Sequence, residues 1–179
     1  DRRFHAQPNA CWTCGPRVWL ADAQGEDLDA RDAIAETAEL LKQGAIVALK
    51  GLGGFHLAVD ASQNEAVERL RWRKGREEKP LALMSSTLEQ IESYAVIGEP
   101  ERRLLTSSQR PIVIVPKRPG NSIAPEVAPK NRYFGVMLPY TPLHHILLAH
   151  PFLALVMTSG NISEEPIAID NLEAVKRLG

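Results

Sequence analysis

The basic stretch RKGREEKP, residues 73–80, is the part of the sequence whose residue types point most directly to chemistry. Half of its positions are cations, in a chain whose formal net charge is only -1: Arg73, Lys74, Arg76 and Lys79. Lysine offers a mobile point charge and arginine a planar bidentate fork, so their alternation suits a polyphosphate with several oxygens. The alternative is a solvated helix end, where cations complement the helix dipole.

Two further loops combine close backbone approach with small polar side chains. KGLGGFH, residues 50–56, has three glycines that let backbone N–H groups approach an anion, and Lys50 adds a charge. It lacks the end of a phosphate-binding P-loop, and a tight turn between buried strands explains it equally well. TSGNIS, residues 158–163, offers groups that donate to phosphate oxygens or simply close a turn. Ser159 lacks the Gly-x-Ser-x-Gly elbow of a nucleophile.

Two histidines and one arginine are further candidates. His144 and His145 open the predicted helix of TPLHHILL, where one of them can point into a site as a neutral donor or acid-base group. A capping or packing role is the alternative for either one. Arg110 precedes the apolar run PIVIV and is a candidate anion contact. The sequence does not decide which histidine faces a site.

The composition indicates a soluble globular protein. The chain has 179 residues, 44% of them hydrophobic, which is enough to bury a core in a single domain. Its 21 Lys and Arg against 22 Asp and Glu create no overall field that would draw it to nucleic acid or an anionic membrane. The apolar runs are shorter than the roughly 18 residues of a membrane span, and the N-terminus lacks a secretory signal core. We therefore expect a cytoplasmic protein without membrane association.

The elements that would position these residues follow from periodicity, caps and turns. Residues 1–30 have no sustained hydrophobic period and are interpreted as a tail or linker, and residues 31–179 as the domain. Ser86 and Glu89 predict a capping box. Helices are predicted at 32–44, 64–73, 86–96, 99–106, 142–149 and 170–179, and strands at 45–49, 55–59, 81–84, 112–115, 134–138 and 152–157.

The alternation of these elements predicts the fold class. Helices and strands alternate almost throughout, which favours a single α/β domain with a mixed, largely buried sheet flanked by helices. Ligands of such sheets usually bind at loops that leave the carboxyl ends of strands. The basic stretch lies at a predicted helix-to-strand junction, and TSGNIS directly follows a predicted buried strand.

Taken in order, five stretches resemble one family. These are KGLGGFHLAVDA, LRWRKGREEKPLALM, RPIVIVPK, GVMLPYTPLHHILL and VMTSGNISEEPIAID, which cover about residues 45–171. They are similar to the YrdC-like nucleotide-binding domain in the version carried by the HypF family of hydrogenase maturation factors. That family's Lys-x-Arg and Ser-x-Asn groups hold ATP phosphates, and they fall here on Lys74, Arg76, Ser159 and Asn161.

The resemblance also implies a fold and an activity. The expected fold is the YrdC-like twisted mixed β-sheet flanked by helices. The expected activity is a carbamoyltransferase step, in which carbamate derived from carbamoyl phosphate reacts with ATP to give carbamoyl-adenylate and pyrophosphate. In the family this serves the cyanide ligands of NiFe-hydrogenase, with HypE as protein partner.

The site residues follow from the same resemblance. ATP with Mg²⁺ would be the nucleotide, and the anion for the basic stretch would be its triphosphate. The backbone of residues 51–54 would line the carbamate end. The expected catalytic residues are Lys74, Arg76 and His56, and further nucleotide contacts are Lys50, Lys79, Arg110, Ser159 and Asn161.

The N-terminal stretch RRFHAQPNACWTCGPR resembles the end of the zinc-finger region that precedes this domain in the family. Cys11 and Cys14 would be the last pair of a four-cysteine Zn²⁺ site. These two cysteines and the nearby His5 make only half a site, which we expect to be empty in this chain alone; a redox role is the alternative. The resemblance implies that an acylphosphatase and a carbamoyl-transfer domain accompany this one in the family.

Departures from stand-alone YrdC enzymes bear on the substrate. Those enzymes make threonylcarbamoyl-adenylate for tRNA modification and carry a Thr-x-Thr-x-Tyr-Gly-Leu-like segment where this chain has residues 52–57. They also tend to place an arginine where Met137 stands. The groups that seat an amino acid are missing, which favours carbamate. A threonylcarbamoyl-adenylate synthase is the nearer alternative, and an RNA-binding module, against which the neutral net charge counts, is the other.

Overall fold

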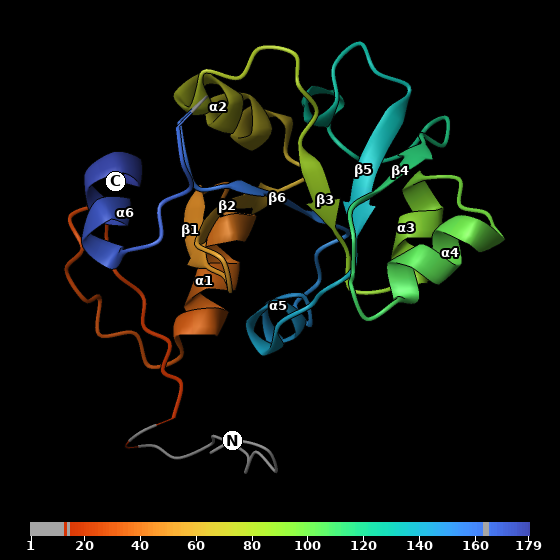
Figure 1. Ribbon diagram of the computed structural model, residues 1–179. Helices are drawn as coiled ribbons and strands as arrows, with labels where there is room; N and C mark the ends of the chain where they lie inside the picture. Colours follow the sequence, from red (N-terminus) through yellow and green to blue (C-terminus); the bar gives the residue numbers. More distant parts are fainter. Residues whose placement is uncertain (1–12, 14, 163–164) are drawn as a thin grey trace.

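The protein is built around a mixed β-sheet, seen in the computed structural model of Figure 1, which describes residues 13, 15–162 and 165–179. The strands in this part of the chain are β1 (Val47–Lys50), β2 (Phe55–Asp60), β3 (Ala82–Met84), β4 (Val113–Pro116), β5 (Tyr133–Met137) and β6 (Leu155–Ser159). The helices are α1 (Ala33–Lys42), α2 (Asn64–Lys74), α3 (Leu88–Tyr94), α4 (Glu99–Thr106), α5 (Pro142–Leu147) and α6 (Asn171–Leu178), with a short 3-10 turn η1 (Pro125–Val127).

The sheet order is β1-β2-β6-β3-β5-β4, so the last strand in sequence lies in the middle of the sheet. β3 and β5 are parallel, and every other neighbouring pair is antiparallel. The register of β2 and β6 places His56 opposite Ser159. The predicted mixed α/β sheet is therefore confirmed.

Helices cover both faces of this sheet and bury two apolar clusters. The first cluster contains Leu70 of α2, Ile91 of α3 and Leu105 of α4, packed on the strands. The second contains Leu41 of α1 and Leu147 of α5. All of these side chains are almost fully buried. Burial of one such side chain stabilises the folded state by about 2 kcal/mol. The two clusters together therefore hold the helices firmly against the sheet.

Several element boundaries differ from the predicted ones by up to three residues, and two of these differences have a clear physical cause. The capping box of α3 is formed by Thr87 and Gln90, one residue later than predicted, because Ser85 and Ser86 carry the extended chain out of β3 before the helix begins. β6 begins at residue 155 instead of 152. Phe152 closes a turn by donating its backbone N–H to a nearby carbonyl, and its side chain is buried between α1 and α5.

Part of the predicted tail packs on the domain. Leu28 donates its backbone N–H to the carbonyl of Leu20 over 2.9 Å, which closes a turn across residues 20–28. Gly25 in this turn lies so close to Val175 of α6 that a Cβ would come within 2.9 Å of its side chain. Among the described residues, no helix combines the length and apolar character needed to cross a membrane.

Candidate functional site

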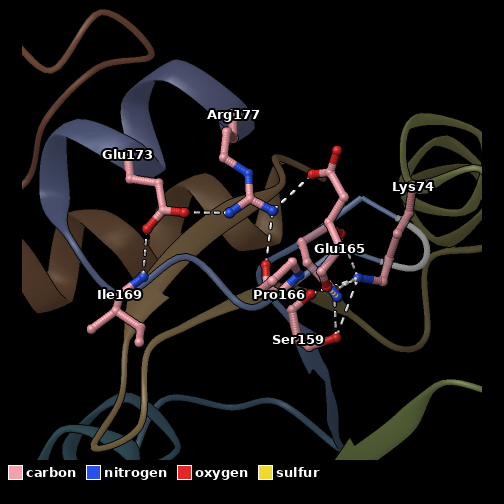
Figure 2. Close-up of polar contacts among 8 residues, drawn as sticks. Lys74, Ser159, Glu165, Pro166, Ile169, Glu173 and Arg177 are labelled. Carbon is pink, nitrogen blue, oxygen red and sulfur yellow. Dashed lines mark hydrogen bonds and ion pairs between the residues drawn. The ribbon is translucent and has the colours of Figure 1, made fainter.

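Lys74 is the centre of the site. It is the last residue of α2, and only 3% of it is exposed. Its ammonium donates to the carbonyl of Ser159 over 2.6 Å, to the carbonyl of Asn161 over 2.7 Å and to Asn161 Oδ1 over 2.6 Å (Figure 2). These acceptors all belong to Ser159 and Asn161, so the end of β6 and the residues after it hold the ammonium in place.

The phase of α2 explains why a lysine is buried there. Val67, Leu70 and Lys74 are spaced for one helical face, and the first two lie in the apolar core. Gly75 then ends the helix at φ 60, the left-handed conformation that glycine adopts without a Cβ penalty. The chain turns immediately after Lys74 and leaves its ammonium over the end of β6.

The electrostatics of this position favour an anion. Burial lowers the pKa of Lys74, and the charges of Arg76 and Lys79 act in the same direction, so that together they bring it to about 8. Burial also lowers the pKa of the Arg76 guanidinium. Cations gathered in a partly desolvated position repel one another, and the attraction of a bound anion would offset both this repulsion and the cost of burying the charges.

Arg76 bridges two strands beside this lysine. Its guanidinium donates to Thr158 Oγ1 over 3.2 Å and to the carbonyl of Pro80 over 2.8 Å, so it spans the end of β6 and the approach to β3. Arg71, which was not among the predicted site residues, is only 5% exposed and donates to the carbonyls of Glu77 and Lys79. Its position three residues before Lys74, on the inner face of α2, is the sequence feature that could have predicted its burial.

The loop after β6 supplies hydrogen-bond acceptors for Lys74. Asn161 Oδ1 accepts from the Ser159 hydroxyl over 2.6 Å as well as from Lys74. Gly160 donates its backbone N–H to the carbonyl of Phe55 over 2.7 Å, and a Cβ at this position would lie only 2.6 Å from that oxygen. The glycine is therefore required for the close approach that fixes the loop against β2.

His56 extends the site along β2. It lies opposite Ser159 in the ladder, and its ring lies against Gly51 of the glycine-rich turn, where a Cβ would be 3.0 Å from His56 Cε1. Its ring centroid is 6.5 Å from that of Tyr140 and 6.1 Å from that of His144. The Nδ1 atom of His56 is buried and has no hydrogen-bond partner among the described residues.

His144 is the histidine of the pair that faces inward. It is fully buried, and neither of its ring nitrogens has a partner in the described part of the chain. Burial lowers its pKa to about 4, helped by the charges of His56 and His145, so the ring is neutral near pH 7. His145 is exposed. Buried nitrogens normally have hydrogen-bond partners, so these two are suited to bind a polar group of a ligand.

Two of the expected nucleotide contacts, Lys50 and Arg110, form hydrogen bonds with other parts of the fold. Lys50 donates to Asn171 Oδ1 over 2.6 Å at the start of α6. Arg110 donates to the carbonyl of Leu105 over 3.1 Å and precedes β4. The strand registers align the beginning of β4 with the beginning of β6, so Arg110 lies at the end of the sheet opposite Ser159.

The predicted metal ligands and Met137, which stands where stand-alone YrdC enzymes tend to have an arginine, complete the site residues. Cys11 and Cys14 lie outside the described residues. Within the described part, no group of three or more His, Cys, Asp or Glu side chains is placed to hold a metal ion. Met137 is buried in the apolar cluster that also contains Met84 and Met157, so no charge stands at that position.

A Lys-x-Arg pair at the end of a helix, facing Ser-x-Asn after a central strand of a mixed sheet, defines a YrdC-like domain. Residues 39–179 match the Sua5/YciO/YrdC family model, described as telomere recombination, and residues 1–21 match the HypF finger. The chain belongs to the Sua5/YciO/YrdC family, and its high-identity relatives are HypF carbamoyltransferases, which confirms the resemblance seen in the sequence.

The relatives give the extent of this similarity. The chain is 49% identical over 178 residues to carbamoyltransferase HypF of Rhodobacter capsulatus, covering 99% of the chain and 23% of the relative. It is 24% identical over 152 residues to threonylcarbamoyl-AMP synthase of Bacillus subtilis, covering 83% of the chain and 44% of that enzyme. The chain thus spans 20–23% of the length of its HypF relatives.

Solved structures agree with this fold. Full-length HypF in its phosphate- and nucleotide-bound form superposes with a TM-score of 0.88 at 47% identity, covering 99% of this chain and 23% of that one. Sua5 of P. abyssi complexed with L-threonine gives a TM-score of 0.69 at 21% identity, covering 81% and 43%. The second match supports the fold alone.

Proposed function

We propose that this domain condenses carbamate with ATP to form carbamoyl-adenylate and pyrophosphate. The observation that carries the proposal is the convergence of Lys74 and Arg76 with the Ser159 loop at the end of β6. Membership of the family and the high identity to HypF carbamoyltransferases support it. The nucleotide named for the full-length HypF structure is consistent with a nucleotide substrate.

In the proposed reaction, a carbamate oxygen attacks the α-phosphorus of ATP. The bond from that phosphorus to the bridging oxygen breaks, and pyrophosphate leaves with the electron pair. No covalent protein intermediate is needed, so catalysis consists of positioning and charge stabilisation. Lys74, Arg76 and Lys79 would neutralise the triphosphate, while Ser159 and Asn161 would hold the Lys74 ammonium in position. Mg²⁺ would enter with the nucleotide, as this ion usually does.

The carbamate end would lie along β2. The backbone of residues 51–54 and His56 would line it, and the neutral His144 ring would form its polar floor together with Tyr140. Neutral rings suit this place because they can donate or accept a hydrogen bond without trapping the product by charge. The buried Met137 leaves no cation for an amino-acid carboxylate, which favours carbamate over threonylcarbamate.

The wider role is also part of the proposal, because the chain spans only 20–23% of the length of its HypF relatives. Residues 1–30 would be the end of a zinc-finger region, with Cys11 and Cys14 as two of four Zn²⁺ ligands, and residues 31–179 the adenylate-forming domain. Carbamoyl phosphate would supply the carbamate, and HypE would receive the carbamoyl group toward the cyanide ligands of NiFe-hydrogenase in the cytoplasm. Arg110, at the end of the sheet opposite Ser159, is less well placed for the nucleotide than Lys74.

The test is ATP binding by calorimetry with Mg²⁺, using the wild-type chain and a Lys74→Ala, Arg76→Ala double variant. The matched control is Arg73→Ala with Lys42→Ala, which removes one arginine and one lysine from helices without touching the Ser159 loop. We expect loss of binding only in the first variant. Equal binding by all three proteins, each shown to be folded by circular dichroism, would contradict the proposal.

The substrate is tested by pyrophosphate release. Ammonium carbamate with MgATP should release pyrophosphate, whereas L-threonine with bicarbonate should add nothing above the bicarbonate background. Release that depends on threonine would instead identify a threonylcarbamoyl-adenylate synthase. The Lys74→Ala, Arg76→Ala variant should be inactive with either mixture.

A further inference from the structure

The loop that carries Asn161 is fastened to α6 by one arginine. Arg177 has 19% of its side chain exposed, and its Nη2 donates to the Glu165 carboxylate over 2.7 Å and to the carbonyl of Pro166 over 2.8 Å. Its other terminal nitrogen pairs with Glu173 one helical turn earlier (Figure 2). The guanidinium therefore links a helix to two successive residues of the loop.

Glu165 carries this link to the lysine. Its backbone carbonyl accepts from Asn161 Nδ2 over 2.6 Å, while its side chain is held by Arg177. On the other side of the amide, Asn161 Oδ1 accepts from Lys74 and from the Ser159 hydroxyl. A continuous series of hydrogen bonds thus runs from α6 to the buried ammonium.

The orientation of the Asn161 amide is the critical point in this series. An amide has an oxygen that accepts and a nitrogen that donates, and a 180° rotation exchanges them. If the nitrogen faced Lys74, two donors would meet at the position where the ammonium needs an acceptor. The Glu165 carbonyl accepts only from the nitrogen, so it fixes the oxygen toward Lys74.

Helix α6 is itself firmly placed. Its first residue, Asn171, accepts from the Lys50 ammonium over 2.6 Å. Glu173 accepts from the backbone N–H of Ile169 over 3.2 Å, and Val175 packs against Gly25 of the N-terminal turn. The helix therefore provides a fixed support for Arg177.

We propose that Arg177 is a positioning residue for the phosphate-binding side chains. By holding Glu165 and Pro166, it fixes the loop in which Asn161 orients Lys74. It acts through these residues rather than by contact with the nucleotide. This inference rests on the proposed function, since the ligand that it prepares the site for is the triphosphate of ATP.

The experiment compares Arg177→Met with Arg103→Met. The control removes an arginine that makes the same type of pair, to a glutamate four residues earlier, on the exposed surface of α4. Calorimetry with MgATP should show about a 5- to 10-fold higher Kd for Arg177→Met, the loss of one hydrogen-bonded link. Adenosine, which lacks phosphates, should bind all three proteins alike. Arg177→Lys should restore part of the affinity, because lysine keeps one donor for Glu165.

Several outcomes overturn the inference. An unchanged Kd for ATP in Arg177→Met would show that the loop is positioned without the arginine. An equal loss of ATP and adenosine affinity would show a general structural role of α6.

If the wild-type chain binds no ATP, the proposed function fails, and a measurement without ligand tests the role of Arg177 separately. NMR should then show faster hydrogen exchange of the Asn161 side-chain amide in Arg177→Met, and unchanged exchange would refute the positioning role.

Discussion

The buried ammonium of Lys74 should make ATP affinity depend on pH. Its pKa in the empty site is lowered to about 8, first by burial and then by the charges of Arg76 and Lys79. If Lys74 neutralises the triphosphate as proposed, the bound anion returns this pKa toward its ordinary value. Above pH 8, binding must therefore be accompanied by uptake of one proton.

The size of the effect follows from this pKa. At pH 7 roughly nine in ten Lys74 side chains are charged before ATP binds, and at pH 9 roughly one in ten. The affinity for ATP should then fall about tenfold between these values, which corresponds to about 1.4 kcal/mol. His144, with its pKa near 4, does not titrate in this range, and a terminal phosphate titrates near pH 6, about two units below.

The assay is calorimetry with MgATP from pH 7 to 9.5, repeated in buffers with different ionisation enthalpies so that proton uptake is measured directly. Lys74→Met should bind ATP more weakly and should show no proton uptake near pH 8. An affinity that is independent of pH in the wild-type protein, or the same slope in both proteins, would refute the reasoning. Circular dichroism at each pH confirms that both remain folded.

The ligand-free protein provides an independent check with a defined sign. The folded state releases the Lys74 proton near pH 8, whereas the unfolded chain keeps it up to its ordinary pKa of 10.5. Between these values the unfolded state binds more protons, so this group makes the free energy of unfolding rise with pH. Urea unfolding should show this contribution in the wild-type protein and not in Lys74→Met.

Three further substitutions test other parts of the site. Gly160→Ala should destabilise the fold by about 1–3 kcal/mol in urea unfolding, because its Cβ would meet the Phe55 carbonyl at 2.6 Å; an unchanged midpoint would contradict this. His144→Phe should leave ATP affinity intact and raise the KM for carbamate at least tenfold in pyrophosphate assays, whereas His145→Phe should change neither; equal effects would count against a buried polar floor. Arg110→Ala should leave the Kd for ATP unchanged in calorimetry, and a weaker affinity would place this arginine in the site after all.

Local signals made much of the fold and the phosphate end of the site predictable. Glycines at helix ends, helix-capping residues and the spacing of hydrophobic residues predict which segments are helices and which are strands. The burial of Lys74 follows from its phase relative to Val67 and Leu70 on the inner face of α2. The Ser-x-Asn turn after an apolar strand predicted a second component, and the structure brings Ser159 and Asn161 to Lys74.

Other features depend on contacts between distant segments, which no local pattern encodes. The direction and register of the strands decide that Arg110 lies at the end of the sheet opposite Ser159, although its residue type suits an anion. Arg177 has the pattern of an ordinary charged helix residue, because its loop acceptors, the Glu165 carboxylate and the Pro166 carbonyl, are fixed by tertiary packing. The inward orientation of His144 rather than His145 depends on how α5 rotates against β2.

The central position of β6 links the site to the order of synthesis. A growing chain that ends at residue 154 can pair β1 with β2, and β3 with β5 and β4, but has no strand to join these two pieces. Lys74 must also wait for Ser159, which follows 85 residues later. Until then β2 and β3 present open edges, where unpaired strands aggregate. The phosphate site can form only when the last strand enters the sheet, so nucleotide binding should report completed folding of the domain.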